Sequence, residues 1–398
     1  MSKRRASGEG TLTFDPRRAL WVGRVPATVD PRRRVVYART QGEARQKLRL
    51  AIRDAELGLV IMSPNSRLCE WLDRWLGIVR SRVESGDLAP STAAGVERDV
   101  RRFLQPNLGR IPLRKLTPGH IEAAFGAMRA AGYAPKTVSH VRGTLSRCLR
   151  DAQRDRLIEQ NAARLVDPPR LTHRLPSAFT VEEFGRISTV CADDRLGPLF
   201  VFAALTGLRR SELLGLRWRD LDLEGGTFQV REGLHHISRA AESVTGRSGL
   251  VRSRPKTEDS GNRLPLSRQA IALLRDHHRD QAARRLRCPQ PWPEPPELTP
   301  VFASEVGTPL HPSNVARAWR LVLDRAEVPH LTSDGRPRGM HELRRTFATR
   351  LRDRGIPLED VQRLGRWSSS AMLLQVYSAS GEERLRAAAD AAGDALSR

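Results

Sequence analysis

Two proline-containing stretches constrain the fold of this chain more than any other feature of its sequence. They are SPNSRL at 63–68 and VDPPRLTHRLPSAFT at 166–180. Proline lacks the backbone N–H that a helix or an inner strand requires, so regular structure must end at each stretch. We interpret both as linkers. With 398 residues, the chain is then predicted to contain three domains, at residues 1–62, 63–167 and 176–398.

The first segment has the pattern of a small sheet followed by one helix. TLTF, ALWVGRVPATV and RRVVYART are rich in β-branched and aromatic residues, which predicts three short strands. After Thr40, apolar residues recur at helical spacing. Residues 1–60 carry 14 Lys or Arg against 6 Asp or Glu. Such a basic sheet can lie in a DNA major groove, and a basic surface without specific contacts is the alternative.

The second segment is helical in pattern along almost its whole length. Four helices are predicted from CEWLDRWLGIVRSRV, PSTAAGVERDVRRFLQPNLG, TPGHIEAAFGAMRAAG and APKTVSHVRGTLSRCLRDAQRDRLI. The first turns at Ser91-Thr92 and Lys136-Thr137 can present amides and hydroxyls to phosphates. A helical bundle with exposed arginines is the simpler interpretation.

The third segment mixes helix with strand. A strand pair is predicted from TFQVREGLHH and RSRPKTEDSGNRLPL, and helices are predicted at 267–286, 311–326, 341–353 and 357–364. The prolines of CPQPWPEPPELTP at 288–300 predict a surface loop. The insertion at 235–255 can contact either DNA or a partner, and the sequence leaves that choice open.

The balance of charge indicates an anionic partner. Lys and Arg number 68 against 45 Asp and Glu, and the net charge of +23 is spread along the chain. Nucleic acid is the polyanion that best explains this excess. A compositional preference can explain arginine in place of lysine, but it does not explain the excess of cations over anions.

Membrane, secreted and disulfide-rich classes are not expected. No apolar run approaches the roughly 18 residues of a membrane span, and the N-terminus lacks a signal-peptide pattern. We therefore expect a soluble cytoplasmic protein without a membrane partner. The four cysteines, at positions 69, 148, 191 and 288, form no CxxC pair, which argues against disulfides and structural zinc.

The stretch GMHELRRTFATRL at 339–351 nearly contains the zinc-binding motif HExxH. That motif needs a second histidine one helical turn after the first. Position 345 is an arginine, which stays protonated and cannot bind a metal, so no metal is predicted here. His341 and Arg344 remain as neighbours on one helical face.

A second pair of charged residues stands in TGLRRSELLGLRW, which begins at Thr206. Arg209 and Glu212 are three residues apart and are therefore neighbours on a helix surface. A carboxylate in that position can orient the guanidinium for bidentate phosphate binding. Taken alone, a surface ion pair is the simpler interpretation.

Four stretches, taken in order, resemble the catalytic boxes of tyrosine recombinases of the phage-integrase type: TGLRRSELLGL, PKTEDSGNRLPL, HELRRTFATRL and LGRWSSSAMLLQVYS. The likeness covers about residues 176–385 and extends more weakly to the preceding segments. It implies a multidomain α+β fold. The parts would be an N-terminal arm-type DNA-binding module of three strands plus a helix, an all-α core-binding domain, and a mainly-α catalytic domain with a small antiparallel sheet.

The resemblance gives each box a chemical role. The implied catalytic residues are Arg209, Lys256, His341, Arg344, Trp367 and Tyr377, with Glu212 and Arg366 in support. Arg209 and Arg344 would clamp the scissile phosphate together with His341. Lys256 would be the general acid for the departing 5′ oxygen, and Tyr377 the nucleophile. Protein cations would stabilise the transition state, so no metal or other cofactor is expected.

Two positions depart from the family's pattern. Arg345 stands where many relatives have a histidine, and we treat it as tolerated rather than catalytic. After Gly365, where the family usually has His or Trp, this chain has Arg366 and then Trp367. We assign the position to Trp367, whose indole N–H can donate to a phosphate oxygen, with Arg366 as second choice. A core tryptophan without a catalytic role is the alternative.

The implied function is site-specific recombination by the integrase of a phage or mobile element, through a 3′-phosphotyrosyl intermediate. The implied partners are double-stranded DNA at attachment sites, further copies of the chain in a homotetramer, a DNA-bending host factor and an excisionase. The implied location is the bacterial cytoplasm, at the nucleoid. The alternatives are a DNA-relaxing enzyme similar to type IB topoisomerases and a non-catalytic DNA-binding regulator.

Overall fold

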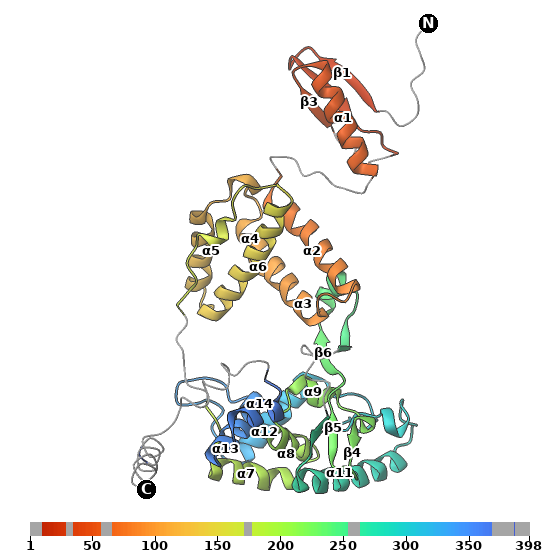
Figure 1. The fold of residues 1–398 in the computed structure, drawn as a ribbon, viewed down its shortest axis with the longest axis vertical. Coiled ribbons are helices and arrows are strands. Elements are labelled where there is room, and N and C mark those ends of the chain that lie inside the picture. Colours follow the sequence, from red (N-terminus) through yellow and green to blue (C-terminus); the bar gives the residue numbers. More distant parts are fainter. Residues whose placement is uncertain are drawn as a thin grey trace, which may run out of the picture. The chain divides into compact units, whose positions relative to one another are not determined.

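The computed structural model describes residues 10–28, 35–56, 66–170, 177–253, 263–367 and 386. The chain divides into two compact units: Met1–Trp75 with Val100–Pro169 forms the first, and Leu76–Asp99 with Arg170–Arg398 forms the second. Figure 1 labels their helices and strands. Most elements are helices and the sheets are small and antiparallel, which confirms the predicted fold class. The boundaries of the three domains stay a prediction.

The first unit begins with a three-stranded sheet that packs against one helix. Its elements are β1 (Thr11–Asp15), β2 (Leu20–Arg24), β3 (Val35–Ala38) and α1 (Gln41–Glu56), and the antiparallel strand order is β1-β2-β3. Val25, Leu48 and Ala51 form its buried core. The close packing requires glycine at Gly23, because a Cβ there would stand 2.7 Å from Val36. The predicted strands and helix are confirmed.

Helices make up the rest of the first unit. They are α4 (Gln105–Leu108), α5 (Pro118–Ala130) and α6 (Pro135–Arg154), with a π-helical turn at Val100–Leu104 and 3-10 turns at Leu113–Lys115 and Ala162–Arg164. A further helix, α2 (Leu68–Glu84), begins in this unit and ends in the second. The indole N–H groups of Trp71 and Trp75 join α2 to α6, donating to the Cys148 carbonyl (3.1 Å) and the Asp151 carboxylate (2.8 Å).

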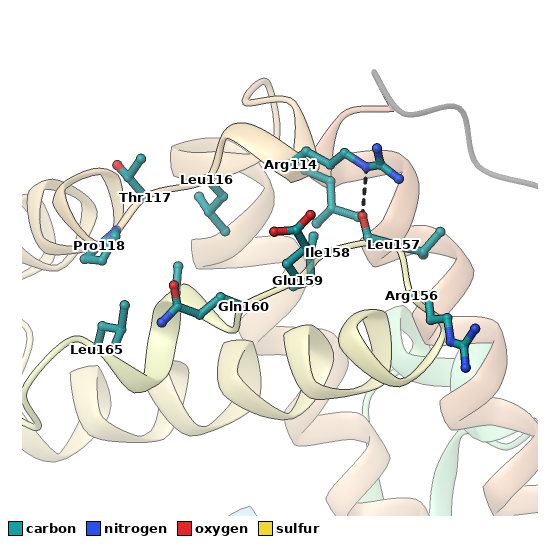
Figure 2. A pocket seen from close by; sticks show the side chains of 12 residues that line it. Arg114, Leu116, Thr117, Pro118, Arg156, Leu157, Ile158, Glu159, Gln160 and Leu165 are labelled. Atoms are coloured by element: carbon teal, nitrogen blue, oxygen red, sulfur yellow. Dashed lines mark hydrogen bonds between the residues drawn. The ribbon is translucent and has the colours of Figure 1, made fainter.

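A cavity of about 490 Å³ lies in the first unit beside the start of α5. Its lining comes from the segments around residues 114–118 and 156–165, as Figure 2 shows. Arg114 Nε donates to the Leu157 carbonyl at 3.1 Å. The charged side chains at its edge, Arg114, Arg156 and Glu159, are exposed. None of the described residues of the implied catalytic set lines this cavity, so it is not taken as the candidate site.

The second unit packs most of its helices around one large apolar core, and smaller cores lie beside it. The helices are α3 (Pro90–Asp99), α7 (Val181–Ala192), α8 (Gly197–Thr206), α9 (Arg210–Gly215), α10 (Glu242–Thr245), α11 (Arg268–Arg287), α12 (Pro312–Arg325), α13 (His341–Asp353) and α14 (Leu358–Gly365). Phe200, Phe202 and Trp319 are among its buried side chains. The four helices predicted after residue 266 are present as α11 to α14. None of the described helices combines the length and apolar character that a membrane span requires.

Two small sheets lie in the second unit. One has the order β4-β5-β8, from β4 (Leu221–Asp222), β5 (Thr227–Gln229) and β8 (Arg263–Pro265), and the other pairs β6 (Gly233–Ile237) with β7 (Gly249–Ser253). The predicted strand pair is therefore divided between two sheets. The first predicted stretch supplies β5 and β6, and the second supplies β8 and the end of β7, so each sheet contains a strand from both.

The insertion at 235–255 contacts a helix of its own chain. Ile237, Ala241 and Val251 form a small buried cluster, against which Ala94 of α3 packs. Beside this cluster, the Ser243 hydroxyl donates to Glu97 at 2.9 Å. The described part of the insertion is thus packed on α3, which the sequence did not indicate.

Candidate functional site

Three arginines from separate helices of the second unit gather around one carboxylate. Arg209 is the residue before α9, Arg344 lies in the first turns of α13, and Arg366 follows the end of α14. Their common partner is Glu212, whose charge acts on all three guanidinium groups. The helices α8 and α13 pack against each other and bring these residues together (Figure 1).

Glu212 is the centre of the cluster. It is buried, and its carboxylate accepts from Arg209 Nη1, the Arg209 backbone N–H and Arg366 Nη2, each at 2.8 Å. Burial acts to raise the pKa of Glu212. The charge of Arg366 and the bonds from Arg209 outweigh burial, and the pKa is lowered. Glu212 is therefore ionised at neutral pH and holds both guanidinium groups.

Arg344 is fixed from two sides. Its Nη1 donates to the carbonyl of Gly207, and its guanidinium carbon lies 4.0 Å from the ring centre of Trp367. Its Nη2 is buried and has no acceptor among the described residues. Burial first, and then repulsion from Arg209, lowers the pKa of Arg344 to about 9. The side chain is still charged at neutral pH.

Trp367 reaches Arg344 because Gly365 leaves room for the indole ring. A Cβ on Gly365 would overlap that ring, so no other residue fits at this position. The ring packs with Ala348 and Val361 in a small core of its own. At this position the chain therefore combines a glycine that makes space with a tryptophan that stacks on an arginine.

His341 begins α13, three residues before Arg344. The residue is exposed at the mouth of the site. Partial desolvation by the surrounding protein first, and then the charges of Arg345, Arg344 and Arg209, lowers its pKa to about 4. The imidazole is therefore neutral at pH 7, where it can donate one hydrogen bond and accept another. With Arg210 and neighbouring residues it lines a cavity of about 320 Å³.

A buried ionic network holds the start of α13 and was not predicted. Arg338 donates to both oxygens of Glu183, at 2.6 and 2.8 Å, and to Glu342 at 3.3 Å. Glu342 also accepts from the hydroxyl of Ser177. The glutamate of HELRR was the one available signal in the sequence, since a carboxylate on a buried helix needs cationic partners. The network fixes the turn from which His341 and Arg344 project.

The cluster as a whole is suited to an anion. Three guanidinium groups face one carboxylate, which leaves two positive charges in excess in a largely buried place. Arg209 is the accessible member, with 37% of its side chain exposed. Within the described ranges, no three His, Cys, Asp or Glu side chains are grouped so that they would hold a metal ion. A phosphate group matches the charge and the donors of this site.

Comparison with known proteins decides the family. Residues 179–384, more than half of the chain, match the phage integrase family. The chain belongs to the phage integrase family. It is thus a tyrosine recombinase, an enzyme that cuts and rejoins DNA in site-specific recombination.

Relatives of this integrase match over most of their length. An integrase of Streptomyces ambofaciens is 28% identical, over 95% of this chain and 94% of the relative. The Tn1549 transposon integrase, solved with transposon right end DNA, has a TM-score of 0.65 at 20% identity, covering 81% of this chain and 98% of that one. A lambda integrase tetramer bound to a Holliday junction has a TM-score of 0.57 at 20% identity, covering 94% and 96%. The two structures show a shared fold.

The structure of this integrase places six of the eight residues implied by the resemblance. Direct contacts join five of them: Arg209, Glu212, Arg344, Arg366 and Trp367. The sixth is His341, whose pKa is lowered in part by the charges of the neighbouring arginines. Lys256 and Tyr377 lie outside the described residues, and so does the C-terminal tail apart from residue 386. Their roles stay predictions.

The low pKa of His341 gives a testable pH dependence. We expect its imidazole to stay neutral from pH 8 down to about 5, because its pKa is lowered from 6.5 to about 4. The unfolded chain takes up this proton near pH 6.5, so the free energy of unfolding should decrease as the pH falls between these values. Imidazole C–H resonances, identified with a His341→Gln variant, measure the titration. A midpoint near 6.5 would show that the surrounding protein and the neighbouring arginines do not lower this pKa.

Proposed function

We propose that this integrase cleaves one DNA strand at a time with Tyr377 as the nucleophile. The phenolic oxygen would attack phosphorus, the bond to the 5′ oxygen would break, and a 3′-phosphotyrosyl link and a free 5′-hydroxyl would form. The reverse attack by a 5′-hydroxyl rejoins the strand. The phosphodiester energy is retained in the link, so no energy-supplying cofactor takes part.

The observation that carries this proposal is the cluster of cations around Glu212. The transition state at phosphorus gathers negative charge on its non-bridging oxygens, and fixed cations stabilise that charge. Arg209 and Arg344 are proposed to bind these oxygens, since one is accessible and the other has a buried nitrogen atom without an acceptor among the described residues. Both are held in place before substrate arrives, which lowers the reorganisation needed during the reaction.

The remaining residues are proposed to act as proton donors and hydrogen-bond donors. A neutral His341 would donate a hydrogen bond to a phosphate oxygen rather than a proton, because its pKa is about 4. Lys256 would transfer the proton to the departing 5′ oxygen, which arginine could not easily do. The indole N–H of Trp367 is proposed as a further donor to phosphate, in addition to its stacking on Arg344.

At the level of the whole molecule, we propose that residues 1–62 bind arm-type sites, 63–167 bind the core site, and 176–398 carry out catalysis. The substrates would be attachment sites of a phage or integrative element. Four copies of the chain would act together, a proposal supported by the similarity to a lambda integrase tetramer bound to a Holliday junction. A DNA-bending host factor and an excisionase would assist. We place the protein in the bacterial cytoplasm, at the nucleoid.

A covalent-adduct experiment tests the proposed chemistry. The full chain is incubated, with EDTA present, with DNA that carries a nick beside the cleavage position, so that the released fragment cannot return. A protein–DNA adduct is expected in a denaturing gel, with the DNA attached to the peptide that contains Tyr377. Absence of any adduct would support the non-catalytic regulator. Relaxation of plasmids without recombination between two sites would support the topoisomerase-like alternative.

A further inference from the structure

Arg366 occupies a backbone position that arginine rarely takes. It ends α14 in the left-handed conformation, with φ 53° and ψ 52°. Glycine is the usual residue there because a Cβ costs about 1 kcal/mol or more in this region. Ala19, Arg156 and Glu327 also have a positive φ, so the conformation by itself gives Arg366 no role, and its contacts have to carry the argument.

Local stability does not explain this arginine. Its side chain is only 2% exposed, and within the described ranges Nη2 is the one guanidinium nitrogen with a partner, Glu212 at 2.8 Å. Its Nε and Nη1 are buried without an acceptor among the described residues. A buried charge whose donors are incompletely paired destabilises a fold. Among the described residues, the ionic partner of Arg366 is Glu212, the carboxylate at the centre of the site.

Those contacts converge on Arg209 from two directions. The side chain of Arg366 shares the carboxylate of Glu212 with Arg209, and the backbone carbonyl of Arg366 accepts from Arg209 Nη2 at 3.4 Å. The left-handed turn sets the direction of that carbonyl. The next residue, Trp367, contacts the other clamp arginine, Arg344, at 4.0 Å.

We propose that Arg366 is a positioning residue for the phosphate clamp: it fixes Arg209 through Glu212 and through its own carbonyl, and it adds a third positive charge to the cluster. The proposal rests on the proposed function and deepens it. Consecutive residues after Gly365 thus support the two clamp arginines separately, Arg366 for Arg209 and Trp367 for Arg344. The position that the family usually fills with one His or Trp is divided between two residues in this chain.

The test compares cleavage of a normal phosphodiester with cleavage of a methylphosphonate at the same position, in the full chain under single-turnover conditions. The methyl group removes the negative oxygen whose charge the arginines stabilise. Arg366→Met keeps the length of the side chain and removes its charge. We expect it to cleave the phosphodiester about 10²-fold more slowly than the wild type. On the methylphosphonate the variant should cleave less than about 10-fold more slowly than the wild type, because the negative oxygen that the arginines stabilise is absent.

Controls separate the possible outcomes. Arg344→Met should show the same recovery on the methylphosphonate, and Arg363→Met, an exposed arginine of α14, should change both rates equally. One outcome would overturn this inference and leave the clamp intact. In it, Arg366→Met slows cleavage of both substrates equally, while Arg344→Met cleaves the methylphosphonate with a smaller loss of rate than the phosphodiester. If Arg344→Met loses as much cleavage rate on the methylphosphonate as on the phosphodiester, the proposed clamp itself is wrong. If Arg366→Met fails to fold, Arg366→Lys takes its place, with a smaller loss expected and the same comparison of substrates.

Discussion

The Tyr377→Phe variant is expected to bind attachment-site DNA like the wild-type chain and to form no covalent adduct with it. The change removes only the phenolic oxygen, which is the proposed nucleophile, and a phenylalanine ring offers no atom that can attack phosphorus. Binding depends on the cations of the site and on contacts elsewhere, so the gel-shift affinity should be unchanged. The measurement is the amount of protein–DNA adduct on a nicked substrate after denaturation.

The chain offers a matched control for this variant because it contains three tyrosines in all. Tyr133 lies in the first unit, where its hydroxyl accepts from Arg102 Nη2 at 3.1 Å and its ring meets Phe103 edge-on. Tyr133→Phe removes the same single atom and should leave adduct formation intact. An adduct that persists in Tyr377→Phe would end the assignment of the nucleophile.

Helix positions could be predicted from the sequence because the helices bury one face and expose the other. In α12, Val315, Trp319 and Val322 recur at intervals of three and four and are all buried, so the predicted range of 311–326 matches Pro312–Arg325 closely. The strands were harder to predict. The stretch TFQVREGLHH was predicted as one strand, yet Thr227–Gln229 belongs to one sheet and the residues from Gly233 onward belong to another.

Contacts within the candidate site could be predicted only where they are local. Arg209 and Glu212 are three residues apart on a helix, and the expected ion pair is present at 2.8 Å. The bond between Arg366 and Glu212 spans 154 residues, and no local pattern indicates such a pairing. The left-handed turn at Arg366 was also invisible, because the sequence signal for that conformation is a glycine or asparagine.

The position of Trp367 shows how a family pattern can identify a residue without giving its contact. The sequence suggested an indole that donates to phosphate, and the structure shows the ring stacked on Arg344. The stacking depends on Gly365, whose missing side chain makes room for the ring. The hydrogen bond from the indole to phosphate stays a prediction.

The Arg344→Ala variant is expected to cleave DNA about 10²–10³-fold more slowly than the wild type, or worse, because it removes one preorganised charge from the transition state. Arg344 is only 2% exposed, and both its Gly207 and its Trp367 contacts would be lost. Single-turnover cleavage of a nicked substrate at saturating protein measures the chemical step separately from binding.

Folding must be separated from chemistry in this variant, because the change also leaves a cavity beside Trp367. Thermal unfolding of Arg344→Ala gives the temperature below which its rate can be compared with that of the wild type. Arg354→Ala, which removes an exposed arginine at the end of the same helix, should cleave at nearly the wild-type rate. Arg344→Lys keeps a positive charge but loses the planar fork, so an intermediate rate is expected. A folded Arg344→Ala that cleaves as fast as the wild type would remove Arg344 from the site, and with it the arginine clamp on which the proposed mechanism depends.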